Sequence, residues 1–153
     1  MFPSTHDILL EKALSWLSIQ RWNNFPRLRS ISALDHLAFV VHIGTLLISL
    51  MEENGVKTHN LWVFLRKVLF SGFFTFQYSD IQSDVKDKIR ELDPTIYKLL
   101  EDNAYNDILT NWVPEYVIKD IDLVKTSSPE DSLLTFCKIW ASYYEAYNNS
   151  LVY

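Results

Sequence analysis

The stretch Ser32–Asn54 constrains the fold of this chain most, because its middle is apolar nearly all round. Such a pattern predicts one long helix that is buried on most of its faces. Gly55 stands just past its end, in the position where a left-handed residue commonly closes a helix. The longest apolar run, Leu37–Met51, is interrupted by His42 and is shorter than the roughly 20 residues that span a membrane. We therefore expect a core helix, with no membrane as partner.

Start and stop signals divide the rest of the chain into further helices. The clearest start is Ser128, because Pro129 follows at the first helical position and Asp131 stands three residues after the cap. Pro26 helps to keep residues 20–30 irregular, and three glycines leave little material for the turns of a β protein. The predicted helices cover about residues 5–19, 32–54, 60–70, 82–91, 94–108, 114–124 and 129–147. This pattern predicts a single all-α domain over residues 1–153, a compact bundle of six or seven helices without a predicted strand.

Charge and cysteine content narrow the classes of partner. The net charge is −5, which disfavours non-specific binding to nucleic acid or to an anionic membrane. Cys137 is the single cysteine, so an internal disulfide is impossible, and its apolar helix predicts an inert thiol. The first residues lack the basic and long apolar regions of a signal peptide. We therefore expect a cytoplasmic protein that does not bind nucleic acid.

A basic and aromatic segment, Arg21 to Arg29, leads into the acid–histidine pair Asp35-His36 at the start of the long helix. The pattern RW-x-x-x-P-R-x-R followed by this pair resembles the HD-domain metal-dependent phosphohydrolases, specifically their 5'-deoxynucleotidase branch, over roughly residues 10–140. The resemblance implies an HD-like helical bundle in which a His, a His-Asp pair and a later Asp hold a divalent metal that activates water. In this comparison His36 matches the first histidine, and Asp131 is the best match for the last ligand.

The other catalytic positions of that family are changed in this chain. Ser71 and Gly72 stand where the His-Asp pair should be, and Thr75 replaces a glutamate thought to handle protons. A neutral hydroxyl is a weak ligand and glycine offers no side chain, so catalysis should be lost at these positions. The vestigial pair His36 and Asp131 should lie within about 4–6 Å, with Ser71 facing the same point, and should hold a divalent metal only weakly. No other cofactor is expected.

Three further residues are candidates for ligand binding, and each has a structural alternative. In the family Arg21 would face a phosphate and Trp22 would pack on the nucleoside, whereas the alternative pairs Arg21 with an acid and packs Trp22 into the core. Asp80, which still matches the family pattern, can equally cap the helix over residues 82–91. The capping of its own helix is enough to explain Asp131, and His36 has an alternative as a partly buried histidine bonded to backbone.

The last predicted helix carries an aromatic stripe. Its large apolar side chains recur at spacings of three and four: Phe136, Ile139, Trp140, Tyr143, Tyr144 and Tyr147. Because interfaces favour tyrosine and tryptophan, we predict a homodimer or a stable hetero-complex that buries some of Trp140, Tyr143, Tyr144 and Tyr147. The alternative is a monomer whose tyrosine hydroxyls reach water at the rim of the core.

The sequence as a whole favours a catalytically degenerate HD-domain protein with a binding role. Its partner would be a nucleotide or phosphate ligand in the former cleft, or another protein. The first alternative is an active nucleotide phosphohydrolase with an altered metal site. The second is a helical assembly subunit that is unrelated to HD proteins.

Overall fold

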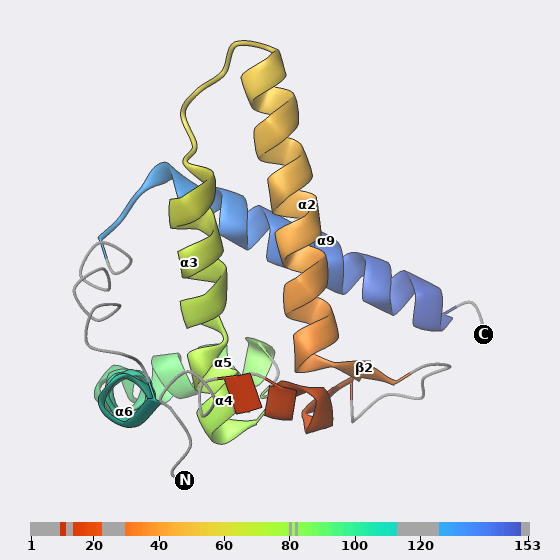
Figure 1. The fold of residues 1–153 in the computed structure, drawn as a ribbon. Coiled ribbons are helices and arrows are strands. Elements are labelled where there is room, and N and C mark those ends of the chain that lie inside the picture. Colours follow the sequence, from red (N-terminus) through yellow and green to blue (C-terminus); the bar gives the residue numbers. More distant parts are fainter. Residues whose placement is uncertain are drawn as a thin grey trace, which may run out of the picture.

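The computed structural model describes residues 10–11, 14–22, 30–79, 81, 83–112 and 126–150. These residues are predominantly helical, which confirms the all-α class. Helices α2 (Ala33–Glu53) and α3 (Leu61–Ser71) form a hairpin, and α9 (Pro129–Ser150) crosses and contacts both of them (Figure 1). Helices α4 (Phe73–Tyr78), α5 (Ser83–Leu92) and α6 (Pro94–Trp112) pack together beyond the end of α3 (Figure 1).

The described chain differs from the predicted elements in several places. A 3₁₀ turn, η1 (Trp16–Ser18), is followed by β1 (Gln20–Arg21), which pairs antiparallel with β2 (Ile31–Ser32). No strand was predicted, because two residues are too few to show an alternating pattern. Among the described residues the set of helices also differs from the predicted one, since the aromatic run after Gly72 folds as the separate helix α4. The helix predicted over residues 114–124 and the side chains of Phe73, Phe74 and Phe76 lie outside the described structure.

Both ends of α2 are fixed by local hydrogen bonds. At its start the Ser32 hydroxyl accepts from the Asp35 N–H at 3.1 Å, and the Asp35 carboxylate accepts from the Ser32 N–H at 2.9 Å. At its end Gly55 has φ of +81° and donates to the Glu52 carbonyl, while Val56 donates to the Met51 carbonyl. This capping box and this C-terminal Schellman motif confirm the predicted start and end of the helix.

The core lies where α2, α3 and α9 meet. Its fully buried side chains include Val40 from α2, Phe64 from α3 and Cys137 from α9. Gly44 lets the α2–α3 hairpin close, because a Cβ at this position would overlap the Phe64 ring. Burial raises the pKa of the Cys137 thiol, in keeping with its predicted inertness.

Among the described helices, α2 is the one that is long and apolar enough to cross a membrane, judged by length and composition alone. The core helix of a soluble protein passes the same test, and α2 here packs against α3 and α9. The helix has 21 residues, longer than the apolar run seen in the sequence, because its polar first and last turns are helical too. The cytoplasmic location therefore stays a prediction.

The contact between Gly44 and Phe64 generates a first prediction. Gly44→Ala should lower the free energy of unfolding by about 1–3 kcal/mol, because the added methyl group overpacks the α2–α3 contact. Urea denaturation followed by circular dichroism measures the change. Ser49→Ala, at an exposed site on the same helix, is the control and should change stability by about 0.5 kcal/mol or less. Equal stability of the two variants would show that the Phe64 ring can move aside.

Candidate functional site

His36 is buried at the start of α2, with 7% of its surface exposed. The capping box of Ser32 fixes the first turn in which it lies. The N–H of Ala33 also donates to the Ile19 carbonyl at 2.7 Å, which ties the start of α2 to the segment before β1. The β1–β2 pairing then places Arg21 opposite Ile31, close to the same helix start. The segment around β1 and the start of α2 are thereby joined close to His36.

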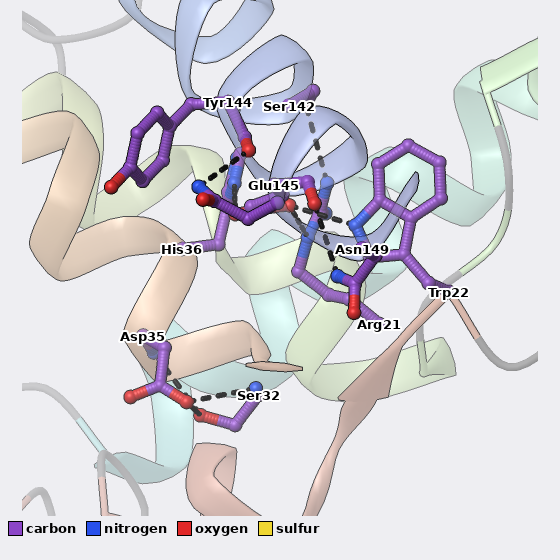
Figure 2. Close-up of polar contacts among 10 residues, drawn as sticks. Arg21, Trp22, Ser32, Asp35, His36, Ser142, Tyr144, Glu145 and Asn149 are labelled. Carbon is purple, nitrogen blue, oxygen red and sulfur yellow. Dashed lines mark hydrogen bonds and ion pairs between the residues drawn. The ribbon is translucent and has the colours of Figure 1, made fainter. Parts of the chain in front are cut away.

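Glu145 on α9 is the centre of this cluster and is 5% exposed. Its Oε1 lies 2.6 Å from Nδ1 of His36, and its Oε2 accepts from Nε of Arg21 at 3.1 Å. Oε2 also accepts from the indole Nε1 of Trp22 at 2.9 Å. Figure 2 shows the three side chains converging on this one carboxylate. We call Arg21, Trp22, His36 and Glu145 the Glu145 cluster.

The electrostatics of the cluster favour an ionised carboxylate. Burial by itself would raise the pKa of Glu145, but the hydrogen bond and charge of His36 and the charge of Arg21 outweigh it and lower the pKa. An ionised carboxylate only accepts hydrogen bonds, so Nδ1 of His36 is the donor in their contact. A carboxylate with a lowered pKa and three donors is a poor general base. The geometry therefore suits a clamp between β1, α2 and α9 better than proton transfer.

Trp22 is held in a strained conformation by this clamp. Its φ of 61° lies in the left-handed region, which non-glycine residues rarely adopt. The hydrogen bond of its indole to Glu145 helps to offset that strain, which typically costs about 1–3 kcal/mol. Arg21 adds a further tie, because its Nη2 donates to the Ser142 hydroxyl at 3.2 Å, one turn before Glu145. The observed pairing of Arg21 with an acid is the structural alternative that the sequence left open.

The structure does not bring His36 and Asp131 together. Asp131 and Glu145 are 14 residues apart on α9, which corresponds to about 21 Å along the helix axis. His36 contacts the Glu145 end, whereas Oδ1 of Asp131 lies 2.6 Å from Nζ of the buried Lys67. Oδ2 of Asp131 accepts from the Ser128 N–H at 2.9 Å. The expected metal-coordination distance between His36 and Asp131 is therefore wrong, because Asp131 caps its own helix and pairs with Lys67.

The remaining positions that the HD-domain resemblance singled out make local contacts or lie outside the described residues. Ser71 ends α3 and donates its hydroxyl to the Val68 carbonyl at 2.7 Å. Gly72 is the buried cap between α3 and α4, and Thr75 is partly buried on α4. Asp80 lies outside the described residues. Within the part of the chain that the structure describes, no group of three or more His, Cys, Asp or Glu side chains could hold a metal ion.

Sequence reasoning did not single out Glu145, the residue on which the cluster depends. A signal was present, because Glu145 is the only acidic residue between Ser132 and Ser150. It also follows Cys137 and Ala141 at spacings of four, which places it on the buried side of the helix. A lone acid on an apolar helix face needs a buried donor, but the sequence does not show which of its basic or histidine residues supplies it.

The opposite side of α9 carries the predicted aromatic stripe, which we call the α9 aromatic face. All of its members are at least half exposed: Phe136 (53%), Ile139 (65%), Trp140 (53%), Tyr143 (66%), Tyr144 (51%) and Tyr147 (54%). Phe136 and Trp140 stack with ring centroids 6.4 Å apart, and Trp140 and Tyr143 stack at 6.3 Å. The aromatic side chains therefore cover one another along the helix and leave the face of the stripe open.

Comparisons with known proteins add no relative. No protein-family model matches the chain, and no curated protein or solved structure is significantly similar to it. The HD-domain resemblance therefore stays a hypothesis drawn from the sequence.

The clamp generates a second prediction. Glu145→Gln should lower the free energy of unfolding at pH 7 by about 3 kcal/mol, since it removes the charge that the partly buried Arg21 and the buried His36 face. Because folding lowers the pKa of Glu145, its contribution is present above the ordinary value of 4.5 and is lost as the pH falls through the folded value. Urea denaturation at several pH values measures both effects.

The exposed Glu52→Gln variant on α2 is the matched control and should be near-neutral at every pH. A difference in the free energy of unfolding between wild type and Glu145→Gln that stays constant from pH 7 to pH 3 would contradict an ionised Glu145 in the folded protein.

Lys138 generates a third prediction. Burial, with smaller effects from Lys86 and Arg21, lowers its pKa from 10.5 to about 8. The folded protein therefore carries this charge at a cost at pH 7, and stability should rise between pH 8 and 10.5 as the amine deprotonates. Lys138→Met should raise the free energy of unfolding at pH 7 by about 1–3 kcal/mol. The exposed Lys98→Met is the control, and a gain from Lys138→Met that persists above pH 10.5 would exclude this cause.

Proposed function

We propose that this chain is a non-catalytic binding module that docks a protein partner on the α9 aromatic face. The observation that carries the proposal is the exposure of six large apolar side chains on one side of one helix. Soluble monomers rarely expose a contiguous apolar patch of this kind unless it binds something. Tyrosine and tryptophan are, in addition, the residue types that dominate binding energy at protein interfaces.

Stacking between neighbouring rings orders part of the α9 aromatic face. The stacked pairs Phe136–Trp140 and Trp140–Tyr143 restrict their side chains before any partner arrives. Side chains that are already ordered lose less conformational entropy on binding, so more of their contact energy remains for affinity. The buried side of α9 holds the helix in place through the Glu145 cluster and the core, which makes the face a rigid element.

The Glu145 cluster favours protein binding over nucleotide binding. Arg21 and Trp22 are the residues that the HD-domain hypothesis assigns to a phosphate and a nucleoside, but both bond to Glu145. A ligand phosphate would have to displace a buried carboxylate that already has three donors, which is unfavourable. Degenerate HD ancestry remains compatible with a binding role, and its support is the sequence of residues 21–36.

A photo-crosslinking experiment tests the proposed function and is the fourth prediction. With p-benzoylphenylalanine in place of Trp140, irradiation of the cells that naturally make the protein should give a covalent protein adduct on denaturing gels. The same group in place of Leu92, which is 86% exposed on α5, is the control and should give none above background. Adduct formation that is equal at both positions, or absent at Trp140, would contradict docking on the α9 aromatic face.

A further inference from the structure

The α9 aromatic face continues onto a second helix. Tyr144 packs on Phe39 of α2 with ring centroids 5.0 Å apart, and α2 exposes Leu46 and Leu50 further along. In Figure 1 the end of α2 that carries them extends past its crossing with α9. The exposed apolar surface thus consists of the α9 aromatic face, which forms a ridge, and an extension on α2. A partner of matching shape would contact both helices.

The part of this surface that lies on α9 carries no charge. Between Ser132 and Asn149 the charged residues are Lys138 and Glu145. Glu145 is buried in its cluster, and Lys138 is partly buried on the side of α9 that faces Arg21 and Lys86. An acidic or basic partner would gain nothing from such a face, whereas an uncharged ridge can meet a copy of itself without repulsion. Elsewhere the net charge of −5 makes two copies repel each other, so this face is the favoured place for them to meet.

The area also fits a pair of copies. Five aromatic side chains that are about half exposed leave roughly 500 Å² uncovered, and Ile139 with Leu46 and Leu50 brings the total to roughly 700 Å². A stable interface of ordinary size buries about 800 Å² on each partner, including its polar rim. An apolar surface of this area therefore supplies nearly the whole apolar part of such an interface on each copy.

We propose that a second copy of this chain is the partner, and that two α9 helices pack antiparallel about a two-fold axis; this inference rests on the proposed function. The ridge runs from Phe136 to Tyr147, so the axis crosses between Trp140 and Tyr143. Each Trp140 then packs against Tyr143 of the second copy, and each Phe136 against Tyr147 of the second copy. The tyrosine hydroxyls lie at the rim, where they reach water or bond across the axis.

Light scattering on the purified chain is the fifth prediction. Wild type should have a mass of about 36 kDa at micromolar concentration, twice the 18.0 kDa of one chain. Tyr143→Glu and Trp140→Lys should each give the monomer mass, because each places an unpaired charge in the interface. An equimolar mixture of the two variants should recover dimers, since Glu at position 143 of one copy then faces Lys at position 140 of the other. Leu92→Glu, on exposed α5, is the control and should stay dimeric.

The outcomes separate this inference from the proposed function. A wild-type mass of 18 kDa at all accessible concentrations overturns self-pairing. An adduct to a different protein in the photo-crosslinking experiment would then leave the proposed function standing. Dimers that persist in both single variants overturn the α9 axis, because the copies then meet elsewhere. If either variant does not melt cooperatively by circular dichroism, Tyr147→Glu with Phe136→Lys replaces the pair, since these two positions also face each other across the axis.

Discussion

The burial of one carboxylate, Glu145, is the constraint on which the arrangement of this fold depends. An isolated charge of this kind would be very unfavourable in the interior, and it is tolerated because donors from β1 and α2 reach both of its oxygens. The same bonds hold the short β1–β2 ribbon, the start of α2 and the far half of α9 together. The strained backbone of Trp22 persists because the indole is one of these donors.

Helix α9 combines two different surfaces. One side buries Cys137, Ala141 and Glu145 against α2, α3 and β1, and the other exposes the aromatic ridge. Because Glu145 is buried and Lys138 is partly buried, the outer side of α9 between Ser132 and Asn149 is left without charge. A rigid helix with an uncharged, aromatic outer side is suited to making contacts with protein surfaces, and this division underlies the proposed binding role.

The helices were largely predictable from local signals, whereas the cluster was not. Ser32, Gly55 and Pro129 mark helix ends by short-range chemistry, so their positions could be inferred from the sequence. The contact of His36 with Glu145 joins residues 109 positions apart, and no local pattern specifies it. The family resemblance directed attention to Asp131, but an acid in a first turn also serves as a cap, and its pairing with Lys67 depends on tertiary packing. The exposure of Tyr143 followed from helical spacing, because one helix cannot bury a stripe on both sides.

The close approach of Gly44 to Phe64 links two positions that lie 20 residues apart in the chain. The ring occupies the volume that any side chain at position 44 would need, so the residue sizes permitted at the two sites are inversely related. A larger residue at position 44 requires a smaller one at position 64, whereas a smaller residue at position 64 alone leaves a cavity in the core. Among naturally varying or engineered versions of this chain, these two positions should therefore change together.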